Sequence, residues 1–193
     1  MAANITSVSQ LRNLYGAPTR TSVQKQTDAL NDTYRQWLKR SCFFVIASVG
    51  DDGVDCTPRG DESGHAFRIL DSKTILIPDR RGNNRLDTLT NIINNPRVAL
   101  LFFIPGIGQT LRVKGCASIS SNNQLLDQFA MENSRPITCI SVAIEAVYFQ
   151  NTRALTRSQL WTATHTDTAS VPTPGQMIQS VNPSFDPDSY DAG

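Results

Sequence analysis

Three arginines of this chain are gathered in one short segment. Arg80, Arg81 and Arg85 surround a Gly-Asn-Asn run, with an apolar, strand-like stretch before them and a helix-like stretch after them. Guanidinium groups offer planar forks of donors, glycine lets a backbone approach closely, and a helix start presents free N–H groups to an anion. The chemistry that this combination could perform is phosphate binding. On the pattern alone, an ordinary solvated loop with surface arginines stays open.

A fourth arginine follows the second strand-like segment of the chain. Arg59 lies in the run Thr57-Pro58-Arg59-Gly60-Asp61. The proline cannot donate to a sheet ladder, so it marks an edge strand or a break. Arg59 either pairs with Asp61 or Glu62 at that edge or points into a cleft, and the pattern does not decide between the two.

Another pair of cations lies on one strand. Thr110, Arg112 and Lys114 alternate with Leu111 and Val113, so the cations share one face of the strand. This face is either open to solvent or a cationic wall beside a ring that takes up negative charge. A reduced flavin is such a ring, because positive charge near its pyrimidine side stabilises the anionic hydroquinone.

Groups for acid–base catalysis are scarce. His65 lies in a loop and His165 in a polar tail, and we find no nucleophile elbow, no Walker A motif and no zinc-protease motif. The four cysteines, at positions 42, 56, 116 and 139, are far apart and form no C-x-x-C, so no metal site is expected. We expect buried free thiols in a reducing cytoplasm. Few acid–base groups beside an anion site suit a cofactor that carries the chemistry itself.

Composition excludes several classes of protein. The chain has 193 residues and a formal net charge of +1, so it offers no overall field for nucleic acid or an anionic membrane. No apolar run approaches the ~20 residues of a membrane span, and the N-terminus lacks the pattern of a secretory signal. We expect one cytoplasmic domain with extensions.

The periodicity predicts a mainly β domain, a small antiparallel barrel with flanking helices, because strand-like runs are joined by hairpin signals without regular β-α alternation. We expect an N-terminal extension over 1–23, the domain over 24–161, and a polar tail over 162–193 that is disordered or draped over a surface. The six or seven expected strands are 42–49, 54–57, 66–70, 74–77, 97–104, 109–120 and 139–149. Helices are expected over 24–40, 84–94 and 122–131, the second capped by Asn83 or Asn84.

The segments 79–87, 95–98, 100–106 and 110–115, with the run 57–61, resemble the pyridoxamine 5′-phosphate oxidase-like, FMN-binding split-barrel family over about 43–161. The resemblance implies a homodimer of six-stranded antiparallel split β-barrels with FMN at the interface. It implies that the flavin ring lies beside residues 57–59 of the second strand and that the arginine-rich loop of 79–87 holds the phosphate. It also implies that the 110–112 strand contacts the ring or the ribityl chain, and that a C-terminal segment reaches the partner's flavin. The cofactor-binding residues carried over are Thr57, Pro58, Arg59, Asp79, Arg80, Asn83, Asn84, Arg85, Thr110, Arg112, Arg157 and Trp161.

The chain also departs from true pyridoxamine 5′-phosphate oxidases. Their Arg-Val-Leu-Leu-Lys strand is replaced by the 56–60 run, and their C-terminal arginine–histidine pair has no match after Tyr148. The sequence therefore leads to the hypothesis of an FMN-binding oxidoreductase that passes a hydride or electrons to or from an unidentified small molecule. The alternative is a non-catalytic binding or carrier protein for a flavin, a deazaflavin or haem.

Overall fold

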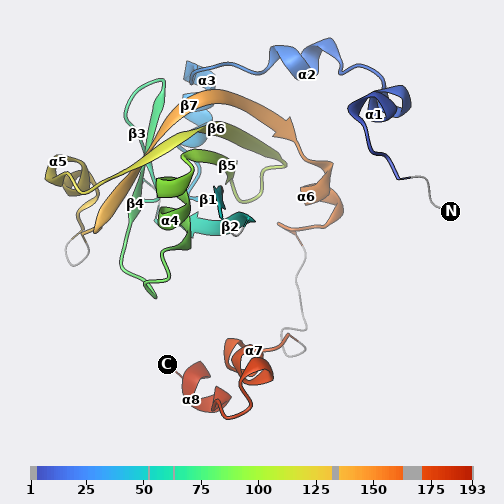
Figure 1. Ribbon diagram of the computed structural model, residues 1–193. Coiled ribbons are helices and arrows are strands. Elements are labelled where there is room, and N and C mark those ends of the chain that lie inside the picture. The colour runs from blue at the N-terminus through green and yellow to red at the C-terminus, as the bar shows by residue number, and fades with distance from the viewer. Residues whose placement is uncertain (1–3, 52, 63, 132–134, 163–170, 193) are drawn as a thin grey trace.

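The computed structural model describes residues 4–51, 53–62, 64–131, 135–162 and 171–192. In this part of the chain, one antiparallel sheet carries the fold, in the order β2-β1-β5-β6-β7-β4-β3 (Figure 1). The strands are β1 (Phe43–Gly50), β2 (Gly53–Gly60), β3 (Arg68–Ile69), β4 (Thr74–Asp79), β5 (Arg97–Phe103), β6 (Gln109–Ser120) and β7 (Thr138–Asn151). Six strands are long and β3 has only two residues, so the predicted mainly β split barrel is confirmed.

Alternating side chains of the long strands build one core inside the barrel. Ile46, Leu100 and Val113 are paired across β1, β5 and β6, and each is at most 2% exposed. β6 follows the predicted alternation, with Leu111 and Val113 buried and Lys114 exposed. The inward residues of neighbouring strands therefore form one continuous buried row.

A helix closes one opening of this core. α3 (Asp32–Leu38) is shorter than the predicted 24–40 helix, because the Asn31 side chain accepts from the Tyr34 amide and caps the helix there. Leu30, Tyr34 and Leu38 pack into the core as the pattern predicted. The preceding residues form the separate helix α2 (Arg20–Gln24).

The helix after β4 begins later than the sequence indicated. α4 (Asp87–Asn94) has Leu86 at its N-cap, where we expected Asn83 or Asn84. Asn84 and Leu86 have φ angles of 59° and 61°, in the left-handed region, which keeps the backbone out of helix until Asp87. The predicted stop at Asn94 is correct. α4 lies against β1, where the Asn91 side chain donates to Ser48 Oγ at 3.1 Å.

A second, small core lies behind β4. The predicted 122–131 helix is divided into α5 (Asn123–Leu126) and the 3-10 helix η1 (Asp127–Phe129). Leu126 and Phe129 pack with Leu76 and Cys139. A short helix, α6 (Arg153–Arg157), follows β7.

Both extensions lie outside the barrel in Figure 1. α1 (Val8–Tyr15) is a helix with no buried residue. The described part of the C-terminal tail is not disordered, because it forms α7 (Pro174–Val181) and α8 (Pro187–Asp191). A capping box between Thr173 and Gln176 starts α7, and the Gly175 amide donates to Asp191 Oδ1 at 2.8 Å. The polar composition did not indicate these helices, because the residues that cap a helix are themselves polar. Residues 163–170 of the predicted tail lie outside the described residues.

Candidate functional site

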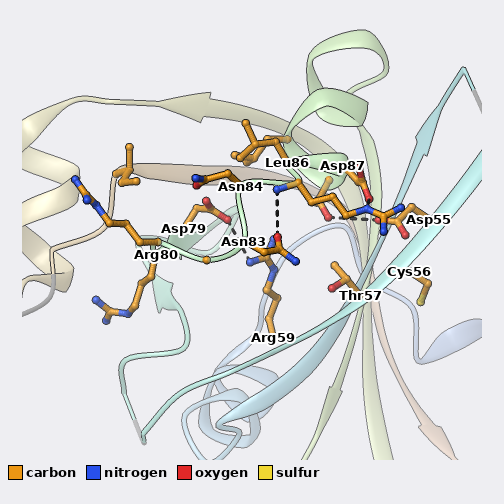
Figure 2. A pocket seen from close by; sticks show the side chains of 16 residues that line it. Asp55, Cys56, Thr57, Arg59, Asp79, Arg80, Asn83, Asn84, Leu86 and Asp87 are labelled. Carbon is orange, nitrogen blue, oxygen red and sulfur yellow. Dashed lines mark hydrogen bonds and ion pairs between the residues drawn. The ribbon is translucent and has the colours of Figure 1, made fainter. Parts of the chain in front are cut away.

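The barrel is split between strand β2 and the end of strand β4. β2 is an edge strand, as Pro58 predicted. β3 pairs only with Ile75 and Leu76, so it leaves the Asp79 end of β4 open. Arg59 of β2 and Asp79 of β4 span the split with an ion pair of 3.2 Å (Figure 2).

This pairing decides between the two sequence-based possibilities for Arg59. The side chain does not pair with Asp61 or Glu62 but with Asp79, whose side chain is only 13% exposed. The register aligns Arg59 with the buried residues Phe44 and Phe102, so it stands on the inward face of β2. Its Nε is buried and lacks a hydrogen-bond partner among the described residues. The arginine therefore presents an unused donor inside the split.

A second ion pair lies beside the first with the charges reversed. Asp61, just beyond β2, accepts from Arg80 Nε at 3.0 Å, and both side chains are 22% exposed. The terminal nitrogens of Arg80 contact the Phe129 carbonyl oxygen at 3.4 Å and Met131 Sδ at 3.2 Å. The guanidinium that we placed at a phosphate site is thus engaged by the protein itself.

The Gly-Asn-Asn loop is held by contacts within its own residues. The Arg85 amide donates to Asn83 Oδ1 at 3.1 Å, and Arg85 Nε lies 2.8 Å from Asp87 Oδ2. Left-handed backbone at two non-glycine positions costs on the order of 1 kcal/mol each. Such strain is retained where surrounding contacts hold a loop in a functional conformation. Here the strained residues lie in the loop for which the sequence predicted anion binding.

Together these segments enclose a cavity of about 500 Å³ (Figure 2). This volume falls in the range of cofactor sites, roughly 300–1,000 Å³. Four arginines and three aspartates line it, and five of these seven charges are in ion pairs: Arg59 with Asp79, Arg85 with Asp87, and Arg80 with Asp61 outside the lining. The lining residues are Asp55, Cys56, Thr57, Arg59, Asp79, Arg80, Arg81, Gly82, Asn83, Asn84, Arg85, Leu86, Asp87, Thr88, Leu89 and Ile137.

The cavity contains seven of the twelve residues predicted to bind a cofactor: Thr57, Arg59, Asp79, Arg80, Asn83, Asn84 and Arg85. It also contains residues that the sequence reasoning missed. Asp55 continues the inward, every-second-residue row of Thr57 and Arg59, so strand alternation could have found it. Thr88, whose hydroxyl lies 3.5 Å from Asp55 Oδ2, and Ile137 gave no signal in the sequence.

The other five predicted residues lie elsewhere. Pro58 is exposed on the outward face of β2. Arg112 stacks over the Tyr148 ring at 5.5 Å, and Trp161 Nε1 donates to the Ile107 carbonyl oxygen at 3.1 Å. Thr110 is 1% exposed and its Oγ1 has no partner among the described residues. Arg157 ends α6. A single chain does not bring these five residues into the cavity.

The cysteines are unpaired, but only one is fully buried, which corrects the expectation of buried thiols. Cys139 is buried, Cys42 and Cys116 are half-buried, and Cys56 is exposed on the edge strand β2. Burial raises the pKa of the Cys139 thiol. The described residues hold no group of three or more histidine, cysteine or acidic side chains arranged for a metal ion. Among them, too, no helix has the length and apolar character to cross a bilayer.

Residues 30–151 match the family model described as pyridoxamine 5′-phosphate oxidase. The chain belongs to the pyridoxamine 5′-phosphate oxidase family. The match includes the sheet and every residue that lines the cavity, whereas α1, α2 and the C-terminal helices lie outside it. No significant match was found among curated protein sequences.

Solved structures share the fold of this family member. A tagged single-residue variant of HupZ from Group A Streptococcus superposes with a TM-score of 0.52 and 17% identity, covering 62% of this chain and 98% of that one. Tagged HupZ without the substitution gives 0.52 and 15% identity, with coverage of 63% and 95%. General stress protein 26 of Bacillus anthracis gives 0.45 and 17%, with coverage of 58% and 86%. At these identities the HupZ likeness establishes the fold alone.

Proposed function

We propose that this protein is a cytoplasmic, dimeric FMN-binding oxidoreductase. The observation that carries the proposal is the cavity in the barrel split, where Arg59 and the 81–85 loop meet although they are far apart in sequence. The family match supports a flavin, and the donor set fits one. Arginine and asparagine donors at one end suit a phosphate, and the unpartnered Arg59 Nε on the strand suits a ring carbonyl or nitrogen.

In this proposal the phosphate is held by Asn83, Asn84 and Arg85, with Arg81 at the mouth. Arg81 makes no ion pair with a described residue, and Arg85 shares its charge with Asp87. The asparagine amides and the backbone of the strained turn supply neutral donors. Because three aspartates also line the cavity, affinity for the phosphate would come from directed hydrogen bonds more than from net charge.

The isoalloxazine ring would lie along β2. Bound flavin accepts and passes on a hydride or electrons at its N5 position, so the protein needs no acid or base of its own for the redox step. Arg59 is placed to donate to the ring, and Asp79 keeps the arginine turned inward. Thr57, on the same inward face of the strand, would lie beside the ring, whereas Pro58 faces outward.

The second subunit would complete the site. The outward face of the sheet has a row in which Pro58, Val45, Leu101 and Arg112 are paired from strand to strand. Val45 and Leu101 are only half-buried there, so an apolar surface is left for a partner. Strand spacing places Arg112 about 14 Å from Pro58 in the same subunit. Thr110, Arg112, Arg157 and Trp161 would therefore act on the partner's flavin rather than on their own.

The competing function is a non-catalytic flavin or deazaflavin carrier. It is favoured by the cavity lining, in which the aspartates face arginine or threonine partners and none of the described lining residues is a histidine. The same lack of histidine disfavours haem. Steady-state reduction of the bound flavin by a nicotinamide donor, followed by turnover with an acceptor, distinguishes an enzyme from a carrier.

The first experiment is a visible absorption spectrum of the purified protein, before and after addition of FMN and desalting. We expect flavin bands at about one FMN per chain. The double variant Asn84→Ala/Arg85→Ala should weaken FMN binding by about tenfold or more, since each lost hydrogen bond to a charged group contributes roughly 1.5–3 kcal/mol, while the melting temperature stays near that of the wild type. Wild-type affinity in the double variant would show that the phosphate lies elsewhere.

A further inference from the structure

The two ion pairs across the barrel split have an unusual arrangement. β2 and the residues after it supply Arg59 and Asp61, and the end of β4 supplies Asp79 and Arg80, so each side offers one charge of each sign. Arg59 and Asp61 are two residues apart on the β2 side, and Asp79 and Arg80 are adjacent on the β4 side. They therefore tie the two edges of the barrel together at neighbouring points, where β2 and β4 are not paired as strands in the described sheet.

The two pairs differ in what else they touch. Arg59 keeps a buried nitrogen without a partner, whereas Arg80 uses its guanidinium on Asp61, on the Phe129 carbonyl oxygen and on Met131 Sδ. Asp61 is itself fixed, because its Oδ1 accepts from the Glu62 amide at 2.8 Å and its own amide donates to the Cys42 carbonyl at 3.2 Å. Arg80 is thus held by two separate segments of the chain, one at Asp61 and one at 129–131.

Arg80 is also the first residue of the loop that lines the phosphate end of the cavity. At the other end of this loop, Arg85 is bound to Asp87 by an exposed pair, with side chains 79% and 49% exposed. The Asp61–Arg80 pair is about three-quarters buried, so solvent screens it less. The buried pair is therefore the firmer of the two anchors.

We infer that Asp61 is a positioning residue for the anion loop, acting through Arg80, and that Arg80 supports the loop instead of binding the phosphate directly. The inference rests on the proposed function and adds to it. Asp61 orients Arg80, Arg80 fixes the start of the 81–86 loop, and the loop then presents Asn83, Asn84 and Arg85 to the phosphate. A group that orients the direct contacts of a ligand contributes to affinity without touching it.

The test compares two flavins that differ only in the phosphate. FMN and riboflavin are titrated into the wild type and Asp61→Asn, a variant of the same shape without the charge, with flavin fluorescence as the readout. We expect FMN affinity to fall about tenfold, the lower end of the effect of supporting contacts, and riboflavin affinity to change less than about twofold. Asp28→Asn, which removes an exposed ion pair with Lys73 away from the cavity, is the matched control.

If Arg80 binds the phosphate directly, the expected change in FMN affinity has the opposite sign. If Arg80 binds the phosphate and Asp61 merely competes for it, Asp61→Asn leaves FMN affinity unchanged or increases it, and that result overturns the inference. Equal loss of FMN and riboflavin affinity would also overturn it, because this marks a general distortion of the barrel.

Arg80→Lys provides a second variant that retains the positive charge. A lysine cannot reach Asp61, Phe129 and Met131 together, so it should lower FMN affinity selectively as well. Unchanged FMN affinity in Arg80→Lys would show that the contacts of the Arg80 guanidinium are not needed for FMN binding. If the wild type binds neither flavin, the proposed function fails, whereas wild-type binding with an unchanged FMN-to-riboflavin ratio in both variants removes only the role of Asp61.

Discussion

At the scale of single residues, the environment of each charged group decides what it can do. Arg59, Arg80 and Arg85 look alike in the sequence, but the structure gives each a different partner: Asp79, Asp61 and Asp87. Of these three, Arg59 has a buried donor, its Nε, without a hydrogen-bond partner among the described residues. The three arginine side chains are therefore not interchangeable: in the proposed site Arg59 faces the ring, Arg80 supports the loop, and the exposed Arg85 contacts the phosphate.

The same principle predicts the reactivity of a thiol outside the cavity. The Cys116 thiol donates to Glu145 Oε1 at 3.2 Å, and this hydrogen bond, with smaller contributions from burial and from the carboxylate charge, raises the pKa of Cys116. A raised pKa means less thiolate at a given pH. Glu145→Gln should lower the pKa and increase the alkylation rate of Cys116 at about pH 8. Mass spectrometry of each alkylated cysteine measures it, with the exposed Cys56 as internal control; an unchanged rate would mean that the contact is absent in solution.

At the scale of elements, one glycine permits two strands to approach closely. The register between β6 and β7 shifts between Lys114 and Gly115, which is the position of a β-bulge. A Cβ at Gly115 would overlap the Ala143 carbonyl oxygen, a backbone atom that cannot turn aside. The bulge lies in the longest strand pairing of the barrel, so the close approach sets the curvature of the sheet around the core.

Gly115→Ala should therefore destabilise the fold by about 2–3 kcal/mol, the cost of forcing extra atoms into a packed interior. Chemical denaturation of the apoprotein measures the free energy of unfolding. Gly82→Ala is the control, because its Cβ would meet nothing within 4 Å and the backbone there is not in the positive-φ region. A loss of stability in Gly82→Ala equal to that in Gly115→Ala would contradict the steric explanation.

At the scale of the whole molecule, the proposed dimer rests on the position of the cavity and on the outward face of the sheet. The cavity contains the loop and the β2 residues, but Thr110 and Arg112 face away from it on the far side of the sheet. The outward surface between these regions includes Phe43, 38% exposed, in ring contact with Phe103 at 5.9 Å. An exposed apolar sheet surface of this kind is typical of an interface.

A charge on this surface tests the assembly. Leu101→Lys should shift the protein from dimer to monomer, because a lysine at the centre of the interface would be desolvated without a partner. Light scattering after size exclusion measures the mass. In the proposed site, FMN affinity should fall when the dimer is lost. Lys114→Glu, at an exposed position of the neighbouring strand, should retain both the dimer and FMN binding. A monomeric wild type that still binds FMN tightly would contradict the shared site.

The local patterns of the sequence determined most of the elements. Alternation, hairpin residues and the Asn95-Pro96 stop depend on neighbours within a few residues, so the strands and the end of α4 were predicted correctly. The loop residues 80–85, which line one end of the cavity, are contiguous, so the sequence already grouped them together. The α7 and α8 helices were missed because helix caps and turns use the same polar residue types that are typical of disordered tails.

Tertiary structure alone decided which charges meet. Arg59 and Asp79 are twenty residues apart, and Arg80 contacts Asp61, Phe129 and Met131 only because the barrel brings the β2 and β4 edges together beside η1. No local pattern encodes such a pairing, because it depends on how the sheet curls and where it remains split. The sequence thus determined the kinds of groups available for an anion and a flavin, and the closure of the sheet determined which arginine faces the cavity and which one supports it.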